Sequence, residues 1–182
     1  MDRQKLEAQL AELPLYEYAF IGTDELLFSE RVRYICETEC PMYNTTWACP
    51  PAVGTVKACQ ERVMAFKEGL LIATITEVSD IANIQETLAT RADHEAITRQ
   101  ALNMVRQQAT DTLTLSTEAC AHCEHCTWPD APCRFPDRMF PCVESHGILV
   151  TDLAEKHGIE FLAQGNIVTW FSLILYKEIP RN

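Results

Sequence analysis

The apolar positions of this chain recur with two spacings, one typical of helices and one typical of strands. Leu6 and Leu10 are four residues apart, as on one face of a helix, whereas the apolar run from Leu70 to Ile75 is short and nearly continuous, as in a buried strand. Along the whole chain, this pattern predicts helices over residues 2–13, 30–36, 55–69, 80–108 and 148–158. It predicts strands over residues 16–20, 70–76, 112–116 and 167–176.

The alternation of helices and strands predicts an α/β fold, a single layered domain with a mixed sheet flanked by helices. At 182 residues the chain suits one domain, residues 1–182, and is too short for two. Asp80 is the expected N-cap of the long helix, whose periodicity weakens near Asp93. His94 on this helix is expected to lie at the surface or to be half-buried. The order of elements also predicts that two cysteine-rich loops lie at one end of the sheet.

Composition narrows the class of partner and the compartment. The net charge is −11 and no cluster of Lys and Arg offsets it, so nucleic acid is a poor partner. The longest apolar segment, 167–176, is too short to cross a bilayer, and the N-terminus has no apolar signal core. These features predict a cytoplasmic protein that is not in a membrane. Nine cysteines in such a chain indicate metal or redox use rather than disulfides.

The segment from residue 120 to residue 133 carries the strongest chemical signal. Cys120, Cys123 and Cys126 follow the spacing C-x-x-C-x-x-C, and Cys133 comes after a turn between prolines. This spacing brings thiolates to one side of a loop, with backbone N–H groups free to point at bound sulfide, as in iron–sulfur proteins. Zinc also takes four thiolates, but its structural sites favour two separated C-x-x-C pairs. The segment therefore predicts a metal site, with an iron–sulfur cluster favoured over zinc.

An earlier block of cysteines is the candidate for a further site. Its members are Cys36, Cys40, Cys49 and Cys59. Prolines within the block make its loop rigid, which suits a metal site. Cys59 has helical spacing to its apolar neighbours, so it is either a ligand or a small core residue. With Cys59, eight thiolates would serve two [4Fe-4S] clusters; without it, the first cluster would have an open iron. Trp47 and Trp128, one near each block, would shield the sites or pack in the core.

Together the two blocks resemble a known family. The resemblance rests on Cys36-x-x-x-Cys40, Cys49-Pro-Pro, Cys120-x-x-Cys-x-x-Cys126, Cys133-Arg-x-Pro136 and Glu144-x-x-Gly147. In this order they resemble a cysteine-rich family of uncharacterised, predicted metal-binding proteins found mainly in anaerobic bacteria and archaea. The resemblance, which runs from residue 36 to the C-terminus, implies an iron–sulfur protein and no particular reaction. Cys142 stands where the resemblance leads us to expect serine, so we interpret it as a structural thiol.

Three functions are compatible with these observations. The first is a cytoplasmic iron–sulfur protein that transfers electrons to or from a partner enzyme, with its acidic surface attracting a basic redox partner protein. The second is a structural zinc-binding module or assembly factor, in which the metal contributes folding energy. The third is an enzyme that uses a site-differentiated cluster with an open iron in the earlier block. The chain has no G-x-G-x-x-G or G-x-x-x-x-G-K loop for a nucleotide, and no catalytic residue can be assigned.

Overall fold

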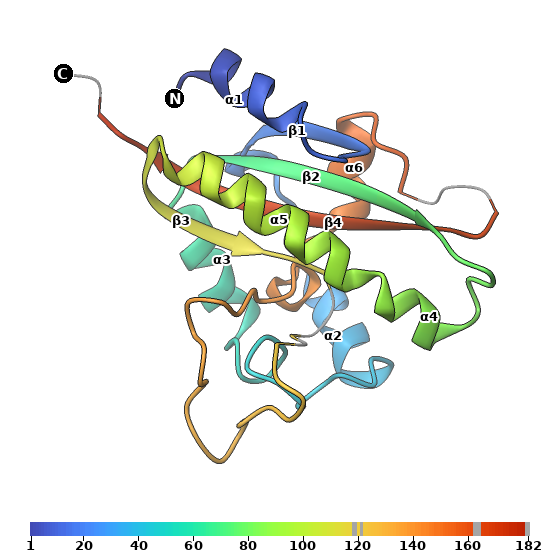
Figure 1. The fold of residues 1–182 in the computed structure, drawn as a ribbon. Coiled ribbons are helices and arrows are strands. Elements are labelled where there is room, and N and C mark those ends of the chain that lie inside the picture. The colour runs from blue at the N-terminus through green and yellow to red at the C-terminus, as the bar shows by residue number, and fades with distance from the viewer. Residues whose placement is uncertain (118–119, 121, 162–164, 181–182) are drawn as a thin grey trace.

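The computed structural model describes residues 1–117, 120, 122–161 and 165–180. Its centre is a four-stranded sheet in the order β1-β2-β4-β3 (Figure 1). The strands are β1 (Glu17–Gly22), β2 (Glu68–Glu77), β3 (Ala109–Leu115) and β4 (Ile167–Glu178). The helices are α1 (Arg3–Leu10), α2 (Glu30–Thr38), α3 (Val56–Met64), α4 (Ile84–Ala89), α5 (Arg91–Arg106) and α6 (Val150–Lys156).

All pairs of neighbouring strands in this sheet are antiparallel. The predicted layered α/β domain is thus confirmed, with the correction that its sheet is antiparallel rather than mixed. The reason lies in the position of β4. Strands β2 and β3 run in the same direction and are joined by a helical connection, but the last strand of the chain inserts between them. Each of them therefore pairs with an antiparallel neighbour.

Helices cover both faces of the sheet, because the central strands are apolar on both faces. Leu70 and Ile72 of β2 pack with α1 and α5 on one face. Leu71 and Ala73 of the same strand pack with α3 and α6 on the other. Successive side chains of a strand point to opposite faces, so one nearly continuous apolar run supplies both layers of core. In the described part of the chain, no helix is both long and apolar enough to cross a membrane.

The predicted long helix over residues 80–108 is two helices, α4 and α5, which meet at Thr90. The N-cap of α4 is Asn83 rather than the expected Asp80. Its side-chain oxygen accepts a hydrogen bond from the backbone N–H of Glu86 at 3.3 Å. Tertiary contact decides this boundary, since the weak periodicity of the segment is compatible with one helix or two.

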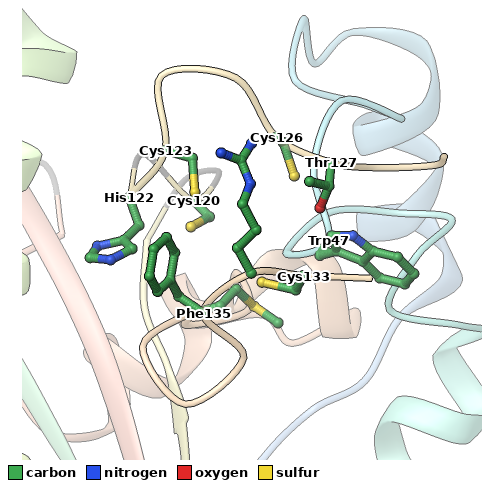
Figure 2. A pocket seen from close by; sticks show the side chains of 10 residues that line it. Trp47, Cys120, His122, Cys123, Cys126, Thr127, Cys133 and Phe135 are labelled. Carbon is green, nitrogen blue, oxygen red and sulfur yellow. The ribbon is translucent and has the colours of Figure 1, made fainter. Parts of the chain in front are cut away.

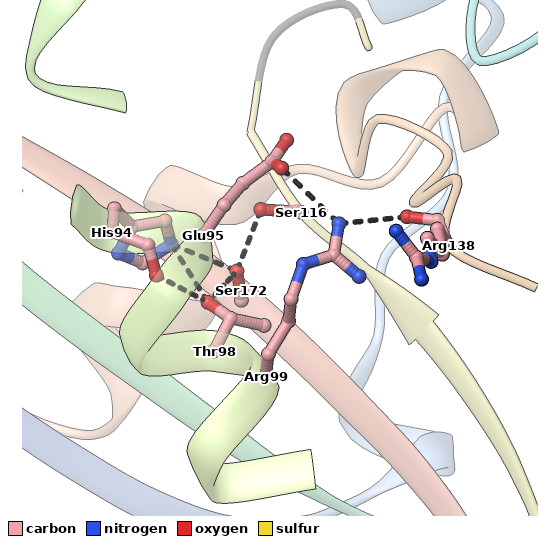
Figure 3. A network of polar contacts seen from close by, with 7 residues as sticks. All are labelled: His94, Glu95, Thr98, Arg99, Ser116, Arg138 and Ser172. Atoms are coloured by element: carbon pink, nitrogen blue, oxygen red, sulfur yellow. Dashed lines mark hydrogen bonds and ion pairs between the residues drawn. The ribbon is translucent and has the colours of Figure 1, made fainter. Parts of the chain in front are cut away.

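A buried polar network lies between α5 and the sheet (Figure 3). At its centre is His94, which is 1% exposed and so more deeply buried than expected. Its Nδ1 atom lies 2.8 Å from Thr74 Oγ1 and its Nε2 atom 2.8 Å from Ser172 Oγ. The Ser172 hydroxyl donates to Ser116 Oγ at 2.9 Å. Ser116 directly follows β3, so the network anchors the point from which the chain leaves the sheet toward Cys120.

Candidate metal centre

Two loops on the same side of the sheet carry most of the cysteines (Figure 1). We call residues 39–55, between α2 and α3, the first loop, and residues 116–143, after β3, the second loop. The backbone N–H of Cys142, near the end of the second loop, donates to Ala48 O in the first at 3.2 Å. The loops are therefore hydrogen-bonded to one another, although they are far apart in the sequence.

The second loop forms a cavity lined by all four cysteines that the spacing singles out (Figure 2). They are Cys120, Cys123, Cys126 and Cys133, each of them half-buried. Trp47 of the first loop and Phe135 line other parts of the wall. Burial raises the pKa of Cys120. This thiol therefore retains its proton at neutral pH until a bound cation replaces that proton.

A further cavity is lined by four cysteines from two distant parts of the sequence. Cys36 lies in the last turn of α2, and Cys40 and Cys49 are in the first loop. The fourth is Cys142, which we had interpreted as a structural thiol. Burial, with the neighbouring Cys40 second, raises the pKa of Cys36 to about 11. Burial also raises the pKa of Cys142, whose thiol donates to Glu144 Oε2 at 2.8 Å.

Cys59 does not line this cavity. It lies on the buried face of α3, with no exposed surface, beside Val56 and Val63. Its sulfur accepts a hydrogen bond from Arg62 Nη2 at 3.1 Å and lies 3.8 Å from Arg33 Nη2. The structure thus brings Cys36, Cys40 and Cys49 together and leaves Cys59 in the core of the domain. The sequence predicts Cys142 to be a structural thiol, and the structure places it in the wall of this cavity.

Two tryptophans join the loops that carry the cavities. The Trp47 indole N–H donates to Ala131 O at 3.1 Å, and the Trp128 indole N–H donates to Asn44 Oδ1 at 2.8 Å. Each tryptophan thus donates into the loop that carries the other. Because Trp47 also lines the second-loop cavity, a side chain of the first loop completes that cavity. The sequence left two roles open for these tryptophans, shielding the sites or packing in the core, and the structure places Trp47 in the wall of the second-loop cavity.

The donor set decides which metal groups these cavities could hold. Thiols are the ligands of iron–sulfur clusters and of structural zinc alike. Within the described residues, no three His, Cys, Asp or Glu side chains are gathered in a way that would hold a metal ion. The four thiols of each cavity instead lie around its wall. A four-iron cluster would take one thiolate at each of its four iron atoms, so the four thiols of each cavity are its candidate ligands.

Comparison with protein families matches residues 19–176 to a family described as predicted metal-binding protein, DUF2284. The chain belongs to this family. The resemblance to a family of predicted metal-binding proteins, drawn from the two cysteine blocks, is thereby confirmed. The matched segment contains all nine cysteines and both cavities. No curated protein and no solved structure matches the chain.

Proposed function

We propose that this metal-binding protein is a cytoplasmic iron–sulfur protein that holds two [4Fe-4S] clusters and transfers electrons to or from a partner enzyme. The observation that carries the proposal is the second-loop cavity. It is lined by Cys120, Cys123, Cys126 and Cys133, all from one C-x-x-C-x-x-C run and the cysteine that follows it. A run of three closely spaced cysteines with a fourth is a ligand pattern of iron–sulfur proteins.

The walls of the second-loop cavity suit a redox cluster. When bound, the cluster would supply one-electron chemistry, and the four thiolates would hold it. Trp47, Phe135 and Met139 are apolar parts of the wall, and they would limit access of water to the cluster. Arg134 also lines the cavity and donates to His125 O, so a positive charge is held beside the thiolates. Solvent exposure and nearby charge are what tune the reduction potential of such a site.

The first-loop cavity is the proposed site of the second cluster. Cys36, Cys40 and Cys49 would supply three of its ligands, as the sequence predicted. The structure pairs none of the nine cysteines, all of them among the described residues, in a disulfide, which fits a reducing compartment such as the cytoplasm. Two clusters in one small protein would let it accept one electron at a time and pass each on. This arrangement supports electron transfer rather than a purely structural zinc module.

A surface beside the first-loop cavity fits a redox partner protein. Tyr34 and Ile35 are 62% and 46% exposed on α2, next to Cys36. The acidic residues Glu37 and Glu39 are exposed beside them. Electron-transfer contacts are small, and an apolar centre with a charged rim gives both binding and long-range attraction. With a net charge of −11, the protein would attract a partner with a basic rim.

The test is metal analysis of protein purified without oxygen, together with a visible spectrum before and after dithionite. We expect about eight iron and eight sulfide ions per chain, and a broad absorbance that bleaches on reduction. Cys123→Ser should lose about half of the iron, because it removes one ligand of one cluster only. Zinc without sulfide in the wild-type protein would overturn the proposal and leave a structural module.

A further inference from the structure

We propose that Cys142, and not Cys59, is the fourth ligand of the first-loop cluster, which decides between the two roles that the sequence left open for Cys59. The inference rests on the proposed function, because it names the ligands of one of the two clusters. It gives that cluster the full set of Cys36, Cys40, Cys49 and Cys142. No iron of this cluster is then left open, so the site serves electron transfer rather than a reaction on a substrate.

The position of Cys142 is the first reason. It lines the same cavity as Cys36, Cys40 and Cys49 of the earlier block. The cavity is otherwise walled by Met42, Tyr43, Pro50 and Ser145, none of which is an anionic ligand. Four thiols around one cavity are a complete ligand set for a four-iron cluster.

The backbone around Cys142 is held independently of any metal. Its N–H donates to Ala48 O, one residue before Cys49, and it forms a bridge with Ser116 at the end of β3. Its carbonyl accepts a hydrogen bond of 2.5 Å from the Ser145 hydroxyl. The fourth thiol is therefore placed by the fold itself. A site that is ordered before binding needs little further ordering when its ligand arrives.

The surroundings of Cys59 oppose a ligand role. Its side chain has no exposed surface and lies among core residues of α3. The Arg62 guanidinium donates to its sulfur, and the thiol itself donates to Val53 O at 3.5 Å. Arg62 also donates to Val53 O, at 2.6 Å, so the Cys59 sulfur, the Arg62 guanidinium and the Val53 carbonyl are all hydrogen-bonded to one another. To reach the cavity, Cys59 would have to break these hydrogen bonds, and α3 would have to rotate out of the core.

The experiment compares three variants purified without oxygen: Cys142→Ser, Cys59→Ser and Cys49→Ser. Cys49→Ser is the control for loss of a first-loop ligand. We expect Cys142→Ser to match it, with about half of the wild-type iron, or with a changed EPR spectrum where the serine oxygen binds iron. Cys59→Ser should keep the full iron content and the wild-type spectrum. The far-UV circular dichroism of each metal-free variant checks that it is folded.

The outcomes separate this inference from the proposed function. Full iron in Cys142→Ser with the wild-type EPR spectrum, and half in Cys59→Ser, would overturn the inference and leave the proposed function intact. Wild-type protein with zinc in place of iron would overturn the proposed function. The ligand assignment would then be read from zinc content, which Cys142→Ser should lower and Cys59→Ser should not. Wild-type protein without any metal would overturn both.

Discussion

The indole ring of Trp47 packs edge-on against that of Trp128, with 4.7 Å between ring centroids and 80° between the ring planes. Around this pair, each N–H donates across to the other loop, to Ala131 O and to Asn44 Oδ1. We call these two rings and their two hydrogen bonds the tryptophan clasp. It joins the Cys40–Cys49 segment to the Cys126–Cys133 segment, so each cysteine cavity depends on the loop that carries the other.

The clasp predicts a measurable coupling between the loops. Trp128→Phe keeps a ring but removes the donor to Asn44, and Asn44→Ala removes the acceptor. Each single change should lower the free energy of unfolding of the metal-free protein by about 1 kcal/mol. The double variant should lose about 1 kcal/mol less than the sum of the two single losses, because both changes remove the same hydrogen bond. Urea unfolding followed by circular dichroism measures these values.

A matched control for the clasp lies elsewhere in the domain. The Trp170 indole N–H donates to Thr90 Oγ1 at 2.7 Å, which joins β4 to the junction of α4 and α5 rather than one loop to the other. Trp170→Phe removes a similar bond, yet it should leave the iron content unchanged. Trp128→Phe, in contrast, should lower iron retention after exposure to a chelator. Equal retention in the two variants would mean that the clasp does not support the cavities.

Arg33 is predicted to hold the first-loop cavity together. This buried side chain donates to Gly54 O at 2.8 Å and also to Ser145 O, which joins α2 to the end of the first loop and to the turn that follows the second. Arg33→Met leaves both carbonyls without this donor and should destabilise the metal-free protein by about 2–3 kcal/mol. Arg31→Met, on the exposed side of the same helix, should change stability by less than about 0.5 kcal/mol. Denaturant unfolding of both variants checks the difference.

His94 predicts a dependence of stability on pH. Burial lowers the pKa of His94 to about 4, against an ordinary value of 6.5. Below pH 6.5 the unfolded chain binds a proton that the native protein does not, so stability falls as the pH drops from 6.5 to 4. Titration of His94 alone should lower the free energy of unfolding by about 3 kcal/mol between pH 6.5 and pH 4.

The His94→Gln variant tests this assignment. It removes the titrating ring, so its stability should depend less on pH between 6.5 and 4 than that of the wild-type protein. The variant should also be less stable at pH 7, because Thr74 and Ser172 lose a well-placed partner. The measurement is the free energy of unfolding of the metal-free protein in urea at several pH values. Parallel pH curves for the two proteins would show that His94 is not the cause.

The exposed apolar surface on α2 predicts a site of electron exit. Tyr34→Ala and Ile35→Ala should each slow electron transfer from the dithionite-reduced protein to a small basic cytochrome several-fold. Ile84→Ala is the matched control, since Ile84 is 66% exposed on α4. Stopped-flow absorbance at low ionic strength measures the rates, and added salt should slow the wild-type reaction. An equal effect of all three changes would place the contact elsewhere.

The sequence by itself determined the α/β class and the set of four cysteines that line the second-loop cavity. Both depend on local spacing: the period of apolar residues sets the element type, and four cysteines within one short segment line a common cavity. Local spacing could not decide the sheet type, because the position of β4 between β2 and β3 is a long-range choice. It also predicted His94 to lie at the surface or to be half-buried, although partners on β2 and β4 bury it fully.

Only the tertiary structure decided which thiol joins the first-loop cavity. By sequence, Cys59 is the next cysteine after Cys49, and Cys142 is far along the chain. The helical period of α3 turns Cys59 inward beside Val63, where Arg62 holds its sulfur. The second loop returns along the first and sets Cys142 beside Cys49 by a hydrogen bond to Ala48. Spacing along a chain places neighbours in one loop, but contacts between loops require the fold.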